Sequence, residues 1–159
     1  MRPPTEIHPV PPVLPAQSAA RHLHPSMRTA DEPLGEQVLA EIAAGLAATT
    51  SWGPPIRRGT IARRRLLATA AYDAWLLEWG PGAQTTPHDH AGSIGVTSVI
   101  EGRLLEIGVD PDDARLPRVH EVVPGGTVGF GIIHRHVLRN PSTRPAAAIQ
   151  VFSPPLGPT

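Results

Sequence analysis

Regularly spaced turn signals after Thr60 limit the fold of this chain more than any other feature. The signals are Gly80-Pro81-Gly82, Glu101-Gly102, Asp110-Pro111-Asp112-Asp113, Pro124-Gly125-Gly126 and Asn140-Pro141-Ser142. The segments between them are short and mix aliphatic with aromatic or β-branched residues, which is typical of β-strands. Short strands separated by regular turns predict an antiparallel sandwich or barrel.

The N-terminal part has a different composition. Residues 1–30 are dense in Pro, which fixes φ and removes a backbone donor, so we expect a disordered tail there and one domain over residues 31–159. Asp31-Glu32-Pro33 has the composition of a helix start, with acids in the first turn and Pro at the first helical position. Apolar residues with helical spacing follow, and they predict one amphipathic helix that ends near Ala48.

Composition excludes several classes of function. The 159 residues include no Cys, which rules out disulfides, thiolate zinc sites and a Cys nucleophile. The formal net charge is zero with His neutral, and the Arg63–Arg65 cluster is short, so we expect no nucleic-acid partner. No apolar run is long enough for a secretory signal or a membrane span. We therefore expect a cytoplasmic monomer or weak homo-oligomer with no membrane partner.

Two His-x-His pairs are the candidate chemistry of the chain. His88 and His90 lie two apart, so in an extended segment both rings share a face and Asp89 points away. His134 and His136 form a second pair on a later β segment. A closed barrel directs inward side chains from distant strands toward one centre, so the two pairs predict a metal site.

The spacing of these pairs resembles the two motifs of cupins. Gly82, five residues, His88-x-His90 and then Gly102 resemble the first motif, while Gly125, ten residues, His136, three residues and Asn140 resemble the second. The usual first motif has a Glu four or five residues after its second His, where this chain has Ile94 and Gly95. That absence resembles the cysteine dioxygenase family over roughly residues 34–156, as do His88-Asp89-His90-Ala91-Gly92-Ser93 and the ending Val151-Phe152-Ser153-Pro154-Pro155-Leu156.

The resemblance implies a mainly β fold, a jelly-roll-like antiparallel cupin barrel with one or two N-terminal helices. It also implies one Fe(II) per chain, held by His88, His90 and His136. His136 is preferred over His134 because it stands four before Asn140 and sixteen before Phe152. His134 stays an alternative, because Arg135 follows it and relatives often have Arg after the ligand.

The resemblance also indicates residues that bind substrate. The family has an Arg on an early strand that holds the carboxylate of the substrate; Arg64, ahead of Leu66, fits that place, and Arg65 is the alternative. The family's Ser-x-His-x-Tyr relay is replaced by Ala148, Gln150 and Phe152. We expect Gln150 and Phe152 to line the pocket, although Gln cannot carry a proton near neutral pH and Phe cannot donate.

The implied function is oxidation of a small thiol, cysteine or a related mercapto acid, to its sulfinate with O2 as co-substrate. Three neutral imidazoles leave the charge of a divalent ion uncompensated, which favours a thiolate ligand. Two alternatives stay open because the relay is missing. One is a metal-dependent cupin enzyme that acts on another small acid, and the other is a non-catalytic cupin that binds a small ligand.

Overall fold

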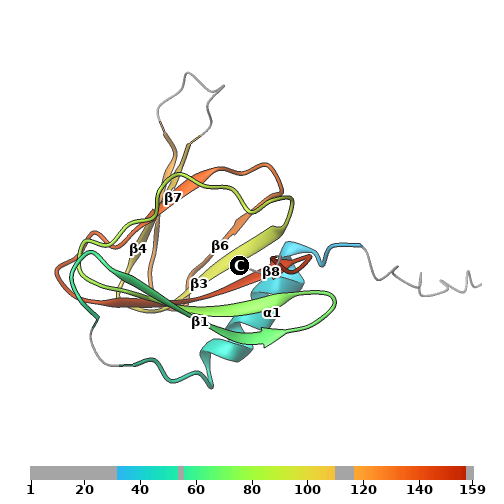
Figure 1. Cartoon of the computed structure of the whole chain (residues 1–159), viewed down its shortest axis with the longest axis horizontal. Helices are drawn as coiled ribbons and strands as arrows, with labels where there is room; N and C mark the ends of the chain where they lie inside the picture. Colours follow the sequence, from blue (N-terminus) through green and yellow to red (C-terminus); the bar gives the residue numbers. More distant parts are fainter. Residues whose placement is uncertain (1–31, 54–55, 110–116, 157–159) are drawn as a thin grey trace, which may run out of the picture.

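The computed structural model describes residues 32–53, 56–109 and 117–156. Within these ranges the chain forms one helix and two antiparallel sheets (Figure 1). The elements are α1 (Glu36–Ala47), β1 (Ile61–Ala68), β2 (Asp73–Trp79), β3 (Ile94–Glu101), β4 (Leu104–Gly108), β5 (Val119–Val122), β6 (Thr127–Phe130), β7 (His136–Arg139) and β8 (Ala146–Ser153). The predicted mainly β fold with antiparallel sheets is confirmed, whereas the predicted tail, residues 1–30, lies outside the described residues.

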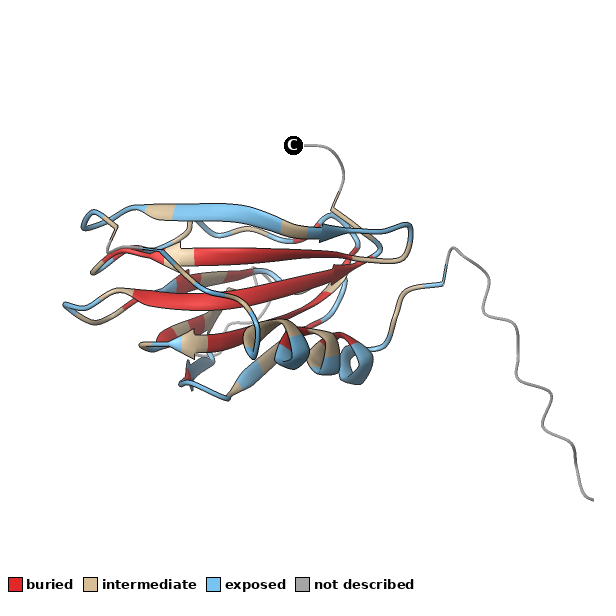
Figure 2. Cartoon of the chain, turned by 90° about the horizontal axis from the view of Figure 1, so that it is seen from below, coloured by how far each residue is buried: buried red, intermediate tan, exposed pale blue. Residues whose placement is uncertain are grey.

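The larger sheet has the strand order β1-β2-β8-β3-β6 and the smaller sheet β5-β4-β7. The central strand β8 is buried along its whole length, and β2 is buried at six of its seven positions. Strands buried on both faces are rich in apolar residues, and most residues of these two strands are apolar. Figure 2 shows the contrast with β1, the edge strand, whose residues are mostly exposed.

Side-chain alternation gives the larger sheet an inner face and an outer face. The inner face turns toward the smaller sheet, and its core cluster combines residues of both sheets, including Trp75, Trp79, Val99, Phe130, Phe152, Leu104, Val122 and Leu138. The outer face is covered by α1, whose Leu39 and Ala43 are fully buried. They pack against Ala74, Leu76, Val96, Ile149 and Val151. The apolar stripe of the helix is thus buried against the outer face of the sheet.

The helix begins later than the sequence predicts. Pro33 was expected at the first helical position, but α1 starts at Glu36, after Gly35 in an extended conformation. The backbone N–H of Leu34 donates to Ser153 Oγ at 2.8 Å, at the end of β8. This tertiary contact holds residues 34–35 extended and overrides the local signal at Pro33. The end of the helix, Ala47 with Ala48 as cap, agrees with the prediction.

The predicted turns that fall in the described ranges all follow or join strands. Gly102, between β3 and β4, has φ of +71°, and Gly125, between β5 and β6, has φ of +81°. The left-handed region favours Gly because other residues suffer a steric cost there. The predicted turn at residues 110–113 lies outside the described residues. Within the described ranges, the single helix is too short to cross a membrane.

Candidate metal centre

Three histidines converge between the two sheets. The ring centroids of His88, His90 and His136 lie 5.0 Å apart in every pair. One nitrogen from each ring lies within 4.8 Å of the corresponding nitrogens of the other two. Imidazole nitrogens so placed can bind one ion, because metal–imidazole bonds of about 2.0–2.1 Å allow ligand atoms to lie about 3–4 Å apart.

Backbone pairing joins the two distant segments. His88 and His136 form an isolated antiparallel bridge, with N–H to carbonyl distances of 3.1 and 3.0 Å. The pair His88 and His90 therefore lies in an extended segment outside the named strands. Asp89 is exposed and accepts a hydrogen bond from the N–H of Ala91, whose φ is +51°. This sharp turn ends the extended segment directly after His90.

Asn140 fixes the turn that precedes this segment. Its buried side chain donates to the carbonyls of Gly80 at 3.1 Å and Arg144 at 2.8 Å. Asn140 follows β7, the strand that begins with His136. The second-motif residue Asn140 therefore holds the first-motif turn in place, and the spacing seen in the sequence has a direct structural use.

Two of the three histidines, His90 and His136, are buried, and a lowered pKa keeps each of them neutral near neutral pH. Burial, aided by His136 and His88, lowers the pKa of His90 to about 3. Burial also lowers the pKa of His136, although a hydrogen bond to Glu106 opposes this. The buried atoms His90 Nδ1 and His136 Nε2 have no hydrogen-bond partner within the described part of the chain. Buried polar atoms are rarely left unpaired, and neutral nitrogens of this kind fit a metal ion.

The tautomers of two rings follow from their partners. His88 Nδ1 lies 2.9 Å from the carbonyl oxygen of Thr86. A carbonyl can only accept, so Nδ1 carries the proton and Nε2 keeps its lone pair. His136 Nδ1 lies 3.2 Å from Glu106 Oε1, which leaves Nε2 of His136 as the free nitrogen.

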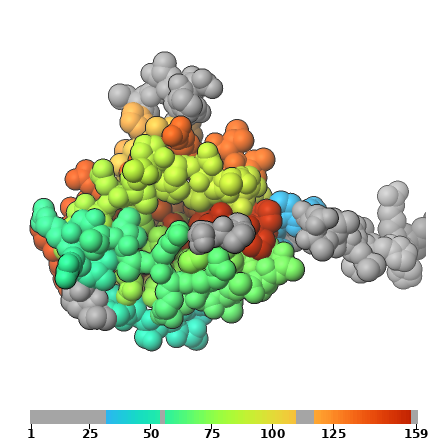
Figure 3. All heavy atoms as spheres, in the orientation of Figure 1, coloured from blue at the N-terminus to red at the C-terminus, as the bar shows by residue number. Residues whose placement is uncertain are grey.

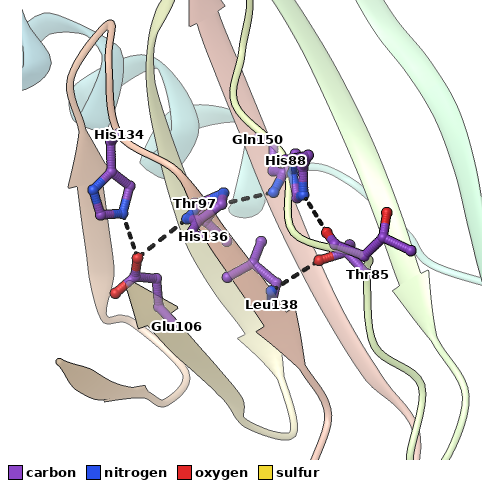
Figure 4. A network of polar contacts seen from close by, with 9 residues as sticks. Thr85, His88, Thr97, Glu106, His134, His136, Leu138 and Gln150 are labelled. Atoms are coloured by element: carbon purple, nitrogen blue, oxygen red, sulfur yellow. Dashed lines mark hydrogen bonds and ion pairs between the residues drawn. The ribbon is translucent and has the colours of Figure 1, made fainter. Parts of the chain in front are cut away.

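The two histidines of the second His-x-His pair, His134 and His136, do not lie on the same strand. His136 begins β7, but His134 lies in the preceding turn, where its N–H donates to the carbonyl of Gly131. His134 Nε2 lies 2.6 Å from Glu106 Oε1 (Figure 4). Glu106, His134 and His136 form a second group with ligand atoms within 4.8 Å of one another. Burial tends to raise the pKa of Glu106, but hydrogen bonds from His136 and His134 outweigh it, and the pKa is lowered.

Sequence reasoning missed Glu106. It lies on β4 with 2% of its surface exposed. The segment Leu104–Gly108 reads as an ordinary strand in which one Glu would face solvent. Only the pairing of β4 with β7, which sets Glu106 opposite Leu138, places the carboxylate beside His136. A lone Glu inside an apolar strand is the available signal, and it is weak without the pairing.

Aromatic rings form one wall of the site. Phe130 stacks on His90 at 4.3 Å between centroids, and Phe152 lies 5.0 Å from the same ring. Both rings lie over Gly95, and a Cβ at this position would clash with them. The inward position that could carry the usual cupin Glu is therefore filled by Phe130 and Phe152, while Ile94 packs in the outer-face cluster.

The other predicted site residues divide between the two faces. Gln150 is on the inner face beside Phe152, buried, and donates to Thr97 Oγ1 at 3.0 Å. Arg64 pairs with Leu76 of the outer face and donates to the carbonyl of Ser51 at 3.3 Å. The structure thus places Arg64 away from the histidines. The expectation rested on the spacing from Leu66, but Leu66 itself packs in the outer cluster.

Arg63 and Arg65 lie on the inner face instead. Their guanidinium carbons are 5.4 and 4.4 Å from the ring centroid of Trp75. Trp75 pairs with Gln150 on β8, so Arg65, Trp75 and Gln150 form one row across the sheet. Figure 3 shows the C-terminal segment, in red, between the β1–β2 hairpin, in green, and the yellow-green segment that precedes β3.

Several solved structures share this fold. The protein TT1209 from Thermus thermophilus is 22% identical, covers 69% of this chain and 94% of its own, and has a TM-score of 0.54. A cupin superfamily protein from Desulfitobacterium hafniense is 12% identical, with 68% and 86% covered and a TM-score of 0.52. An oxalate oxidase solved with the substrate analogue glycolate is 20% identical at a TM-score of 0.55, with 65% of this chain covered. This chain spans 56% of that oxidase.

The family comparison is more specific than the shared fold. The model of the family described as cysteine dioxygenase type I matches residues 58–159, which include all eight strands and the three converging histidines. Family and histidine cluster together support a metal-dependent oxidoreductase of cupin fold. The chain belongs to the cysteine dioxygenase type I family.

Proposed function

We propose that this protein oxidises a small thiol acid, cysteine or a related mercapto acid, to its sulfinate with O2, using one Fe(II) held by His88, His90 and His136. The observation that carries the proposal is the convergence of three imidazoles with no carboxylate among them, two of which, His90 and His136, are buried with lowered pKa values. The alternative with His134 in place of His136 draws no support from the distances, because His134 groups with Glu106 rather than with His88 and His90.

Three neutral ligands favour an anionic substrate. They would hold a divalent ion without compensating its charge, and a thiolate supplies the missing negative charge. The iron, when bound, supplies the redox chemistry that joins both oxygen atoms of O2 to the sulfur. The balance is one thiol and one O2 giving one sulfinic acid, so no further reductant is required.

The aromatic wall keeps water from one side of this site. Phe130 and Phe152 are 3% and 2% exposed and cover His90, so the ring meets apolar surface rather than solvent. A drier site strengthens every electrostatic contact inside it. Phe152 holds no hydroxyl and Gln150 is engaged with Thr97. These residues would therefore shape the pocket without moving protons.

Arg65 is the better candidate for the substrate carboxylate. It lies on the inner face, over Trp75, and its side chain is exposed, so its guanidinium is free to swing toward a bound acid. Guanidinium groups hold carboxylates by two parallel hydrogen bonds. We therefore assign to Arg65 the role first expected of Arg64.

An oxygen-electrode assay of the iron-loaded chain tests the function. Cysteine, 3-mercaptopropionate and cysteamine, which has no carboxylate, form the substrate set. We expect thiol-dependent uptake of one O2 per sulfinate formed, with cysteamine the poorest substrate. Turnover of a small acid without O2 would favour another metal-dependent reaction, and tight thiol binding without uptake would favour a ligand-binding protein.

A further inference from the structure

Glu106 is a buried charged group beside the histidine cluster, and the proposed reaction does not use it. It is 2% exposed, and its Oε1 lies within hydrogen-bond distance of two rings, His134 at 2.6 Å and His136 at 3.2 Å. A buried carboxylate is costly unless it is paired. Here its partners are two histidines, one of which belongs to the candidate metal site.

Strand pairing sets the direction of this contact. Gly108 on β4 pairs with His136 on β7, and Glu106 lies two residues along β4, so Glu106 and His136 are diagonal neighbours. The Nδ1 edge of the His136 ring meets the carboxylate, and the buried Nε2 has no partner within the described residues. Figure 4 shows Glu106 between the rings of His134 and His136. The ring is thereby fixed with Nε2 free to bind an ion.

Two of the three candidate ligands, His88 and His136, have hydrogen-bond partners of different charge behind their rings. His88 donates its Nδ1 proton to a neutral backbone carbonyl, that of Thr86. His136 donates its Nδ1 proton to a carboxylate, that of Glu106. An anionic acceptor behind an imidazole raises the basicity of the opposite nitrogen. His136 is therefore a stronger metal ligand than His88.

We propose that Glu106 is the positioning residue of the metal site. Through its hydrogen bond to His136, it also supplies a negative charge that the three ligands themselves lack. His134 holds the carboxylate in this orientation. The inference rests on the proposed metal site, but it concerns affinity and potential rather than the substrate. The usual cupin motif supplies a carboxylate that binds the ion directly. In this chain the carboxylate of Glu106 would instead be separated from the ion by the ring of His136.

The experiment compares Glu106→Gln and Glu106→Ala with the full-length parent. Gln keeps the shape and an accepting oxygen but removes the charge. We expect Fe(II) to bind about 10-fold more weakly in E106Q and roughly 100-fold more weakly in E106A, the range that loss of such a partner costs. The Fe(III)/Fe(II) potential should rise in E106Q, because the lost negative charge stabilised the ferric state.

Glu121→Gln is the matched control. Glu121 lies on β5, next to β4, is exposed, and pairs with Arg103 at 2.9 Å. E121Q should leave both affinity and potential unchanged. Equal affinity and potential in E106Q and the parent would overturn the proposal and leave Glu106 a merely structural acid. Binding of a second equivalent that E106Q alone abolishes would also overturn it, because Glu106, His134 and His136 would then be ligands themselves.

A second measurement needs no variant. In the parent loaded with Zn(II), a long-range proton–nitrogen spectrum of the imidazoles should show His136 with its proton on Nδ1 and the metal on Nε2. The opposite arrangement would overturn the proposal even if the Glu106 variants fail to fold. A parent that binds one ion in this tautomer but oxidises no thiol would refute the proposed reaction while supporting the role of Glu106.

Discussion

The two faces of the five-stranded sheet are formed by the same strands but have different roles. On the outer face, β2, β3 and β8 present Ala74, Leu76, Val96, Ile149 and Val151 to the helix. On the inner face the same strands carry the polar pair Gln150 and Thr97, and Phe152 packs against His90. Because side chains alternate with a period of two, one strand can hold the fold together and build the site at once. Stability and chemistry should therefore be separable by face.

The largest effect should follow from His136→Ala on the inner face. Removing one of the three proposed ligands should weaken iron binding by more than the roughly 10–100-fold that an outer partner costs. His134→Ala, two residues away, should keep one ion per chain. Metal analysis after anaerobic loading checks both, with circular dichroism to confirm folding. Loss of iron only in H134A would reverse the assignment and make His134, not His136, the third ligand.

Leu39→Ala should show the opposite behaviour on the outer face. Leu39 is fully buried between α1 and the sheet, and such a truncation costs about 2–5 kcal/mol of the free energy of unfolding. The folded variant should still bind one ion, because this cluster contains none of the three candidate ligands. Denaturant unfolding and metal titration measure the two quantities. A loss of metal affinity that matches the loss of stability would show that the faces are not independent.

Arg65→Ala and Arg64→Ala form a matched pair, with one guanidinium on each face. R65A should raise KM for mercapto acids roughly 10- to 100-fold, from the ~1.5–3 kcal/mol of a charge-assisted contact, and leave KM for cysteamine unchanged. R64A should leave both unchanged. Steady-state oxygen uptake checks this. An effect of R64A alone would return the carboxylate contact to the outer-face residue.

Low pH should reduce the free energy of unfolding of the metal-free protein, because His90 on the inner side of the larger sheet resists protonation in the folded state. The pKa of His90 is about 3 in the folded chain and near 6.5 when exposed, so below pH 6.5 the unfolded chain binds a proton that the folded chain does not. Stability is then full above pH 6.5 and falls by up to roughly 1 kcal/mol per pH unit toward pH 3. Unfolding of His90→Phe should depend less on pH. His120→Gln, at an exposed position of β5, is the control and should match the parent.

The smallest effect concerns the relay positions. Gln150→His together with Phe152→Tyr restores a titratable ring and a hydroxyl beside His90, and should raise turnover of cysteine several-fold. Comparison of kcat for the double variant and the parent gives the answer. An unchanged kcat would indicate a pocket built for a thiol other than cysteine.

The fold and the histidine cluster follow from the sequence because both depend on spacing. Turn residues set the strands, and the distances from Gly82 to His88 and from His136 to Asn140 encode the bridge between two segments. The start of α1, the face of Arg64 and the role of Glu106 could not be predicted in this way. Each depends on a neighbour distant in the chain: Ser153 for Leu34, Leu76 for Arg64 and Leu138 for Glu106.

Gly95 has a consequence for how such a site can change over evolutionary time. A Glu at this inward position is blocked by the rings of Phe130 and Phe152, which also cover His90. Placing a ligand carboxylate there thus requires a smaller side chain at position 130 or 152 at the same time, and the single substitution alone would disrupt the core. A single substitution at Gly95 therefore cannot turn the proposed site of three histidines into one with a carboxylate ligand, because the packing around it would have to change as well.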